Sequence, residues 1–203
     1  MKFFFVDCET TGTDTRKHGL IQIAGKIVID NVTERVFNFN AAPMEGDIID
    51  PESLTVTGLT EEQIRAYPDP RGTFLSFRNM LGQHVDKFKR TDKFHFVGFN
   101  SQFDADMIRS WFLKNDDEFF GSWFFWPTID VAQLAAVELM EKRHRMPNFK
   151  LATVATWMGI EFDEEKAHDA SYDIDVTEQI FHLCMRKHIQ PSQSPLNAPM
   201  KEY

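Results

Sequence analysis

The stretch Phe3-Phe4-Phe5-Val6-Asp7-Cys8-Glu9-Thr10-Thr11-Gly12 is the one from which the rest of the chain can be interpreted. Its three phenylalanines and its valine run unbroken towards a Thr-Thr-Gly turn, which is typical of a buried β-strand. Because side chains alternate between the faces of a strand, Asp7 and Glu9 point the same way, with carboxylates roughly 6–7 Å apart. Two like charges at the end of an apolar strand are costly unless neutralised, and this spacing allows a hard cation to be shared. A solvated strand end is the alternative that this stretch alone leaves open.

Length and composition favour one α/β domain. The chain has 203 residues, of which 42% are apolar and 13% aromatic, and this is enough for one well-packed core. We predict a domain over residues 1–189 and a loose C-terminal tail over residues 190–203, which contains three prolines. The net charge of -9 argues against a nucleic-acid partner, unless several of the carboxylates hold divalent metal ions.

The cysteine content and the start of the chain indicate the compartment. Cys8 and Cys184 suit a reducing environment, and nothing suggests a disulfide framework. Only four apolar residues precede Asp7, too few for a signal sequence or a membrane span. We therefore expect a cytoplasmic protein with no membrane contact.

The order of apolar and turn residues predicts alternating strands and helices. Residues 20–29 and 35–40 flank an Asp-Asn turn and, with the first strand, predict an antiparallel meander. Pro51 and Gly58 bracket a predicted loop, and a helix start follows at Thr60. Further apolar runs predict strands over 94–99 and 123–126 and helices around 74–81, 104–113, 130–140 and 150–158. The run 123–126 could instead be a stacking platform for bases, but a buried edge strand is favoured.

A second constellation of polar residues lies at a predicted strand-to-helix junction. Asn100 ends one of the predicted strands and Asp104 opens the following helix. α/β proteins tend to bind ligands at such junctions. A helix cap is the simpler role for Asp104, and this segment alone favours it.

A third constellation surrounds the start of the last helix. Ala170, Ile174, Thr177, Phe181 and Cys184 form a regular apolar stripe along that helix. Asp173 borders this stripe and needs a partner, which the end of the first strand could supply. His168 precedes the helix, and an exposed histidine without a role is its alternative interpretation.

Together the three constellations resemble one family. Asp7-Cys8-Glu9-Thr10-Thr11-Gly12, Asn100-x-x-Phe103-Asp104 and His168-x4-Asp173 look like the three motifs of the DEDDh-type 3′–5′ exonucleases. The resemblance extends between the motifs and covers nearly all of the chain except its tail. A related branch has a tyrosine four residues before the last aspartate, but Asp169 occupies that position here and Tyr172 is out of register.

The resemblance implies a ribonuclease-H-like fold, with a mixed five-stranded sheet flanked by helices. It also implies hydrolysis with two divalent metal ions, Mg²⁺ or Mn²⁺, which prefer carboxylate oxygens and would activate water and stabilise the leaving oxygen. The implied ligands are Asp7, Glu9, Asp104 and Asp173. His168 would take the proton from the attacking water, a task that suits a group titrating near neutral pH.

The resemblance also implies substrate contacts. The backbone at Thr10 and Thr11 would hold the 3′-hydroxyl of the terminal nucleotide, and Val56 would press against its base. Asn100 and Phe103 would line the pocket, although Phe103 could equally belong to the core. A further contact is suggested by charge and not by the resemblance: Lys142, Arg143 and Arg145 gather positive charge in this acidic chain, and their loop would meet upstream phosphates or else be a solvated turn.

The function that the sequence predicts is a 3′–5′ exonuclease that degrades single-stranded nucleic acid to nucleoside 5′-monophosphates. DNA is the favoured substrate, and an RNA-trimming exoribonuclease stays open. The second hypothesis is a binding or proofreading subunit tethered to a polymerase, and a polymerase or a second copy of the chain are the candidate protein partners. The short tail favours a free-standing nuclease. A catalytically dead binder is disfavoured because all five catalytic positions carry the expected residue types.

Overall fold

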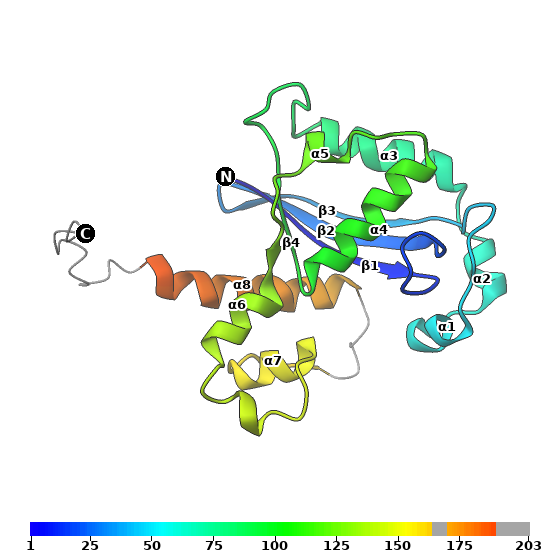
Figure 1. Ribbon diagram of the computed structural model, residues 1–203. Coiled ribbons are helices and arrows are strands. Elements are labelled where there is room, and N and C mark those ends of the chain that lie inside the picture. The colour runs from blue at the N-terminus through cyan, green and yellow to red at the C-terminus, as the bar shows by residue number, and fades with distance from the viewer. Residues whose placement is uncertain (164–169, 190–203) are drawn as a thin grey trace, which may run out of the picture.

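The computed structural model describes residues 1–163 and 170–189, which form a sheet covered by helices on both faces (Figure 1). The strands are β1 (Lys2–Thr10), β2 (Leu20–Ile29), β3 (Val32–Asn40), β4 (His95–Gly98) and β5 (Ile129–Asp130). The α-helices are α1 (Pro51–Thr57), α2 (Glu61–Arg65), α3 (Pro70–Gly82), α4 (Ser101–Lys114), α5 (Phe120–Trp123), α6 (Val131–Glu138), α7 (Leu151–Trp157) and α8 (Ala170–Ile189). A single 3₁₀ turn, η1 (Arg143–Arg145), lies between α6 and α7.

The sheet has the mixed, five-stranded architecture that was predicted. Its strand order is β3-β2-β1-β4-β5, with β1 in the centre. β2 pairs antiparallel with β1 and β3, which confirms the meander, whereas β4 runs parallel to both β1 and β5. Parallel strands end at the same edge of a sheet, so the ends of β1, β4 and β5 lie together.

The phenylalanines of β1 enter two separate cores because strand side chains alternate. Phe4 packs under α3, α4 and α5, where its ring lies 5.1 Å from that of Phe37 and 5.2 Å from that of Phe124. Phe3 and Phe5 face the other side, where their rings lie 5.3 and 5.5 Å from that of Phe181 on α8. The same alternation places Asp7 and Glu9 on the α8 side of the sheet.

The loop predicted between Pro51 and Gly58 is wrong, because this segment forms helix α1. Asp50 caps the helix by accepting a hydrogen bond from the Glu52 N–H at 2.9 Å, and Pro51 begins its first turn. Gly58 ends it in the left-handed conformation, with φ of 68°. These cap signals were present in the sequence. The helix has no buried residue, so it lacks the apolar periodicity from which helices are usually inferred.

The strand predicted over 123–126 is also wrong. Trp123 ends helix α5, Phe124 makes only an isolated bridge to Phe94, and the fifth strand is β5, beyond Pro127. Trp123 and Phe124 are buried, as the prediction supposed, but they enter the core from a helix end and a turn. A short apolar run has the same composition in either case.

Two predictions about residues in helices differ in outcome, the capping role of Asp104 and the apolar stripe on the last helix. Helix α4 begins at Ser101, with Asn100 as its N-terminal flanking residue, so the capping role considered for Asp104 is wrong. The stripe on α8 is confirmed at Ile174, Thr177, Phe181 and Cys184, which are all buried.

Residues 190–203 lie outside the described residues, and the division into domain and tail stays a prediction. None of the helices that the structure describes is long and apolar enough to cross a membrane.

Candidate active site

The end of β1 carries the first two carboxylates of the site. Asp7 and Glu9 alternate with the buried Cys8 and the buried Thr10, so both side chains lie on one face. The register between β1 and β2 shifts between Glu9 and Thr10. Such irregularities redirect a strand where its pairing ends, and here the pairing with β2 ends one residue later, at Thr10.

Helix α4 brings the third carboxylate to this strand end. Asn100 adopts φ of 66°, a left-handed conformation that asparagine tolerates, and this allows the chain to turn from β4 directly into α4. Asp104 in the first turn is buried, and one of its carboxylate oxygens accepts a hydrogen bond from the Cys8 backbone N–H at 3.0 Å. This bond holds the Asp104 carboxylate against the backbone of Cys8, the residue that separates Asp7 from Glu9 in β1.

Helix α8 supplies the fourth carboxylate from its first turn, where Asp173 lies. The helix is fastened to the sheet by Lys26 on β2, whose ammonium pairs with Asp175 and with Glu178, the latter at 2.8 Å. The Phe181 contacts with Phe3 and Phe5 hold the helix further along. Asp173 is therefore placed by a helix that packs on the same face as Asp7 and Glu9.

The electrostatics of the site show that these carboxylates are neighbours. Burial and the charge of Asp173 raise the pKa of Asp7 to about 6. Burial, Asp7 and Asp173 raise the pKa of Glu9 to about 7. Burial and Asp7 also raise the pKa of Asp104, although the Cys8 N–H opposes them. Asp7, Glu9 and Asp104 are therefore each repelled by the negative charge of another carboxylate, and the cluster attracts cations.

The donor set fits hard divalent ions such as Mg²⁺ or Mn²⁺, because the four residues offer carboxylate oxygens only. Bound cations would relieve the repulsion that raises these pKa values. Among the described residues, no three histidine, cysteine, aspartate or glutamate side chains form a ready-made metal site.

His168, the predicted base, lies outside the described residues, so its predicted role stays a prediction. Tyr172, the tyrosine near Asp173, contacts the segment that follows α7. Its hydroxyl accepts a hydrogen bond from the Asp163 backbone N–H at 2.7 Å, and its ring lies 5.3 Å from that of Phe162. Tyr172 thus holds the chain after α7 against α8.

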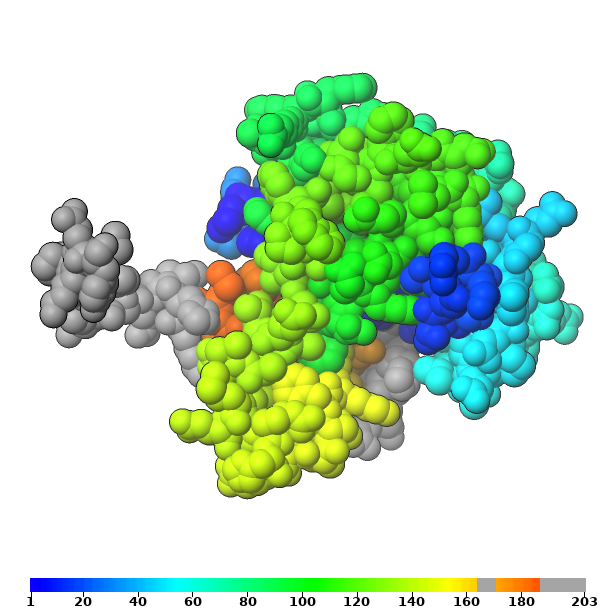
Figure 2. All heavy atoms as spheres, in the orientation of Figure 1, coloured from blue at the N-terminus to red at the C-terminus, as the bar shows by residue number. Residues whose placement is uncertain are grey.

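The predicted substrate residues differ in their exposure. Thr10 and Thr11 are buried, and the Thr11 N–H already donates to the Gly19 carbonyl at 2.9 Å. Val56 is 62% exposed on α1, and Phe103 in the first turn of α4 is partly buried. The exposed Asn100 donates its backbone N–H to the Asp130 carboxylate at 3.0 Å. Figure 2 shows the dark-blue segment after β1 beside the cyan helices α1 and α2.

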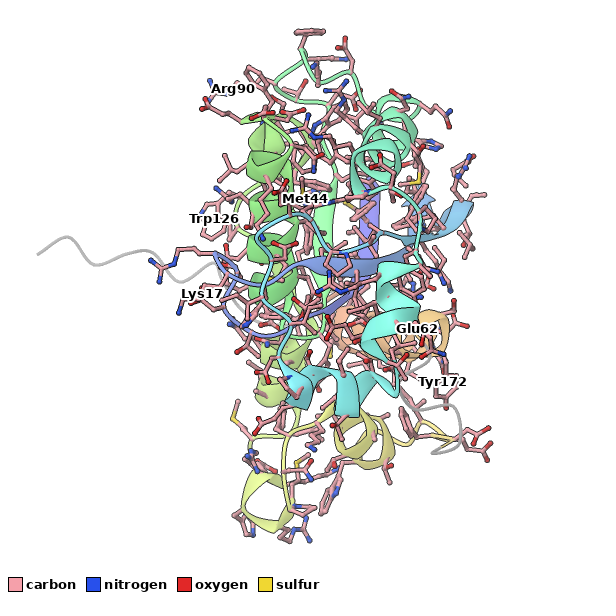
Figure 3. All side chains as sticks on the ribbon, turned by 90° about the vertical axis from the view of Figure 1, so that its right-hand side faces the viewer. Lys17, Met44, Glu62, Arg90, Trp126 and Tyr172 are labelled. Atoms are coloured by element: carbon pink, nitrogen blue, oxygen red, sulfur yellow. The ribbon has the colours of Figure 1, made fainter. Side chains whose placement is uncertain are left out.

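The basic loop lies apart from these residues. Figures 1 and 3 both place the turn between α6 and α7 at the lower end of the molecule. The Arg143 guanidinium lies 5.1 Å from the Phe149 ring, and that of Arg145 lies 5.6 Å from the Trp157 ring. Lys142 and both arginines are exposed, so their charges are available to a ligand.

The sequence interpretation missed a groove beside α4, which has a volume of about 500 Å³. Its lining includes Gln102 and Arg109 of α4 and, from the segment after α5, Trp126. Trp126 is 68% exposed and projects from the surface in Figure 3. The apolar run 123–126 gave the only signal, and treating it as a buried strand concealed the exposed end.

Comparison with known proteins identifies the family of this chain. The sequence profile of the RNase_T family, described as exonuclease, matches residues 4–181. The chain belongs to the exonuclease family. Ribonuclease T of Shewanella frigidimarina is 26% identical to this family member over 191 residues, which cover 90% of the chain and 81% of that protein. Ribonuclease T of Shewanella denitrificans is equally similar, at 26% over 191 residues.

Solved structures share the fold of this exonuclease-family chain. E. coli exonuclease I in complex with a dT13 oligonucleotide superposes with a TM-score of 0.71 at 22% identity. A zinc-bound complex of the same enzyme with single-stranded DNA gives a TM-score of 0.72 at 23% identity. The match covers 94% of this chain but only 42% and 41% of those chains. The predicted ribonuclease-H-like fold is confirmed.

Proposed function

We propose that this exonuclease-family chain is a divalent-metal-dependent 3′–5′ exonuclease that hydrolyses single-stranded nucleic acid, DNA in preference, to nucleoside 5′-monophosphates. The observation that supports it best is the convergence of four carboxylates at the end of β1, with the pKa values of Asp7 and Glu9 raised to about 6 and about 7. Carboxylates that repel one another in a buried site suit metal-assisted phosphodiester hydrolysis.

In this proposal Asp7, Glu9, Asp104 and Asp173 would hold two divalent ions, Mg²⁺ or Mn²⁺. When bound, such ions supply Lewis-acid stabilisation of the phosphate charge and make water a better nucleophile near neutral pH. The Cys8 N–H keeps the Asp104 carboxylate oriented towards β1. His168 accepts a proton from the attacking water, and the packing of α8 on β1 brings Asp173 to the other ligands.

The surroundings of the carboxylates favour a strand terminus. The Thr10–Thr11 segment and α1 stand on one side of them, and Val56 offers an exposed apolar surface to a terminal base. On another side, the groove along α4 is open, and Trp126 offers a face for base stacking while Arg109 supplies positive charge. In this proposal the strand continues along α4, and its 3′ end meets the Thr10–Thr11 segment and α1.

The test is an assay of single-stranded DNA and RNA, each labelled at the 3′ or 5′ end, in Mg²⁺, Mn²⁺ or EDTA. We expect the 3′ label to be released at once as a mononucleotide, while the 5′ label shortens progressively. EDTA should abolish both reactions. Release of the 5′ label as the first product, or full activity in EDTA, would overturn the proposal.

A further inference from the structure

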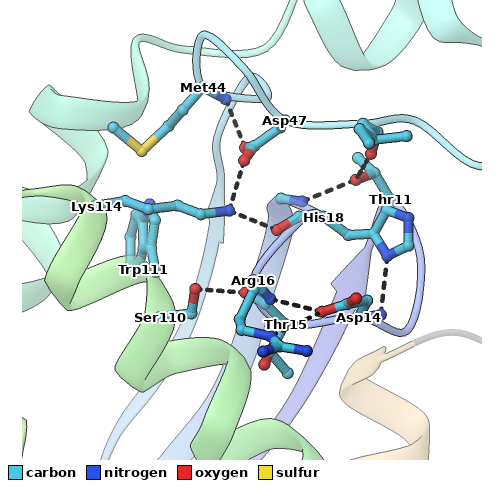
Figure 4. A network of polar contacts seen from close by, with 12 residues as sticks. Thr11, Asp14, Thr15, Arg16, His18, Met44, Asp47, Ser110, Trp111 and Lys114 are labelled. Carbon is cyan, nitrogen blue, oxygen red and sulfur yellow. Dashed lines mark hydrogen bonds and ion pairs between the residues drawn. The ribbon is translucent and has the colours of Figure 1, made fainter.

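Lys114, the last residue of α4, joins three segments that are distant in sequence (Figure 4). Its ammonium donates to the His18 carbonyl at 2.6 Å and to the Asp47 carboxylate at 2.5 Å. The other Asp47 oxygen accepts the Met44 N–H at 2.8 Å. The loop after β1 and the segment before α1 are thereby tied to one helix end.

These two segments are also bonded to each other. The Thr11 hydroxyl donates to the Ile48 carbonyl at 2.6 Å and accepts the Gly19 N–H at 2.8 Å. The Ile48 N–H donates to the Lys17 carbonyl, and the Asp50 N–H donates to the Thr11 carbonyl, both at 2.8 Å. Asp50 in turn caps α1, so the position of Val56 depends on the position of Thr11.

Burial makes the Lys114–Asp47 pair more than a surface contact. The Asp47 side chain is 4% exposed and that of Lys114 is 23% exposed. The packing is tight, because a Cβ atom at Gly19 would lie 2.3 Å from an Asp47 carboxylate oxygen. A buried carboxylate requires a partner, and Lys114 is the one within reach among the described residues.

We propose that Lys114 is a positioning residue for the terminal nucleotide, an inference that rests on the proposed function. Helix α4 presents Asp104 and Phe103 at its first turn and holds the two segments with Lys114 at its last turn. The helix therefore sets the distance between the catalytic carboxylates and the residues that would hold the sugar and base. Lys114 lies about 15 Å from Asp104 along the helix, too far to touch the reacting atoms.

The test compares Lys114→Met with Lys2→Met in the full chain. Lys2 is a matched control, because its ammonium likewise donates to a carbonyl, that of His84, and to a carboxylate, that of Asp92, both at 2.5 Å. The two lysine side chains are similarly buried, at 26% and 23% exposed, although the Asp92 side chain is more exposed than that of Asp47, at 22% against 4%. We expect Lys114→Met to raise KM for a 5′-fluorescein-labelled single-stranded DNA roughly tenfold, with a smaller effect on kcat. Lys2→Met should leave both unchanged.

A double variant separates positioning from stability. In Lys114→Met/Asp47→Asn the unpaired buried charge is removed and the amide oxygen can still accept the Met44 N–H. We expect thermal stability to recover largely towards that of the wild type while KM stays raised.

Amide hydrogen exchange supplies a readout that is independent of activity. Lys114→Met should accelerate exchange at Gly19, Ile48 and Asp50, and Lys2→Met should not. Unaltered exchange at these amides, an unchanged KM in Lys114→Met, or an equal rise of KM in Lys2→Met would overturn the role of Lys114. A wild type that cleaves no nucleic acid would instead overturn the proposed function, and exchange would still show whether Lys114 couples the two segments.

Discussion

At the scale of single residues, the ionised carboxylates of Asp7 and Glu9 lower the stability of the folded protein, and none of the charges that act on them is positive among the causes of their raised pKa values. Both lie where strand geometry points them at a packed face, and the charges that act on them belong to other carboxylates. Their pKa values are raised because burial and repulsion disfavour the ionised form. Residues that lower stability in this way are commonly kept for function.

The first prediction concerns Asp7→Asn. This variant should lose nuclease activity while gaining stability in metal-free buffer, because it removes a charge that is destabilising when ionised. With the folded-state pKa of Asp7 near 6, against 3.8 in the unfolded chain, the cost is fully present above about pH 7. It decreases as pH falls through 6 and is absent below about pH 4, where both states are protonated. The gain should reach roughly 3 kcal/mol at most.

Denaturant unfolding of wild type and variant between pH 4 and pH 8 in EDTA measures this gain. Mg²⁺ should stabilise the wild type at pH 7.5 and have much less effect on the variant. A difference between the two proteins that stays constant over this pH range would show that the carboxylate is not destabilised by folding. Near-normal turnover by the folded variant would contradict the metal-ligand assignment.

The second prediction concerns His168. His168→Ala should lower kcat by ~10²–10⁴-fold, because a general base is lost. Binding of Mn²⁺, measured by calorimetry, should stay close to that of the wild type. Loss of metal binding together with activity would instead identify His168 as a ligand.

At the scale of elements, two surfaces are candidates for binding the upstream part of a strand: the turn between α6 and α7, and the groove along α4. The third prediction concerns the 3₁₀ turn between α6 and α7. Replacing Lys142, Arg143 and Arg145 by alanine should weaken binding of long strands and reduce the slope of log K against log salt, by just under about one unit per lost phosphate contact. Cleavage of a dinucleotide should hardly change, because it does not reach the turn.

The basic cluster at the other end of the molecule is the control. Lys87, Lys89 and Arg90 carry the same total charge, and Figure 3 labels Arg90 at the end opposite to the turn. Alanine at these three positions should leave the salt slope unaltered. If the slope falls here instead, the strand leaves the site towards α5 and the prediction for the turn is wrong. Thermal unfolding of both triple variants is needed, since Arg143 and Arg145 also pack on aromatic rings.

The fourth prediction concerns the groove along α4. Trp126→Ala should weaken binding of an oligonucleotide by ~1–3 kcal/mol, the effect of one lost base–aromatic stack, without altering thermal stability. Trp126→Phe should retain much of the affinity. Phe88→Ala removes an aromatic ring that is 88% exposed on the loop after α3, and it should have no effect. Equal losses in Trp126→Ala and Phe88→Ala would argue against a specific path along α4.

At the scale of the whole molecule, the arrangement of the layers leads to a prediction about the direction of attack. The carboxylates lie where β1, α4 and α8 converge, and the proposed function places the end of a bound strand against the Thr10–Thr11 segment and α1. The fifth prediction is that a circular single strand resists cleavage while its linear form is degraded from the 3′ end. A 3′-phosphate should block the reaction, because it adds charge and bulk where a hydroxyl has to fit.

Gel analysis of the circle, the linear strand and the 3′-phosphorylated strand decides this. Paired ends should react more slowly than single strands, since unpairing the last base costs a few kcal/mol. Cleavage of the circle at the rate of the linear strand would mean an endonuclease and an open site.

The local sequence by itself determined those features whose cause is local. The alternation of β1 placed Asp7 and Glu9 on one face and the phenylalanines in two cores, and the stripe on α8 was legible from its spacing. The candidate carboxylates lie in three short motifs, and the family and the five-stranded sheet followed from the resemblance that these motifs carry. Helix α1 was missed even though Asp50, Pro51 and Gly58 marked its ends, because nothing in it is buried.

Tertiary structure decided what depends on contacts between distant segments. Whether Trp123 and Trp126 are buried or exposed is set by the turn around them, so one apolar run contains both a core residue and a surface ring. The raised pKa values of Asp7 and Glu9 arise from burial and from Asp173, with the charge of Asp7 adding to the effect at Glu9. Of these causes, only the charge of Asp7 is encoded in β1 itself. The Lys114–Asp47 pair joins residues 67 positions apart, and only folding brings them together. Burial and Coulomb interactions depend on distance in space, which the order of residues along a chain does not specify.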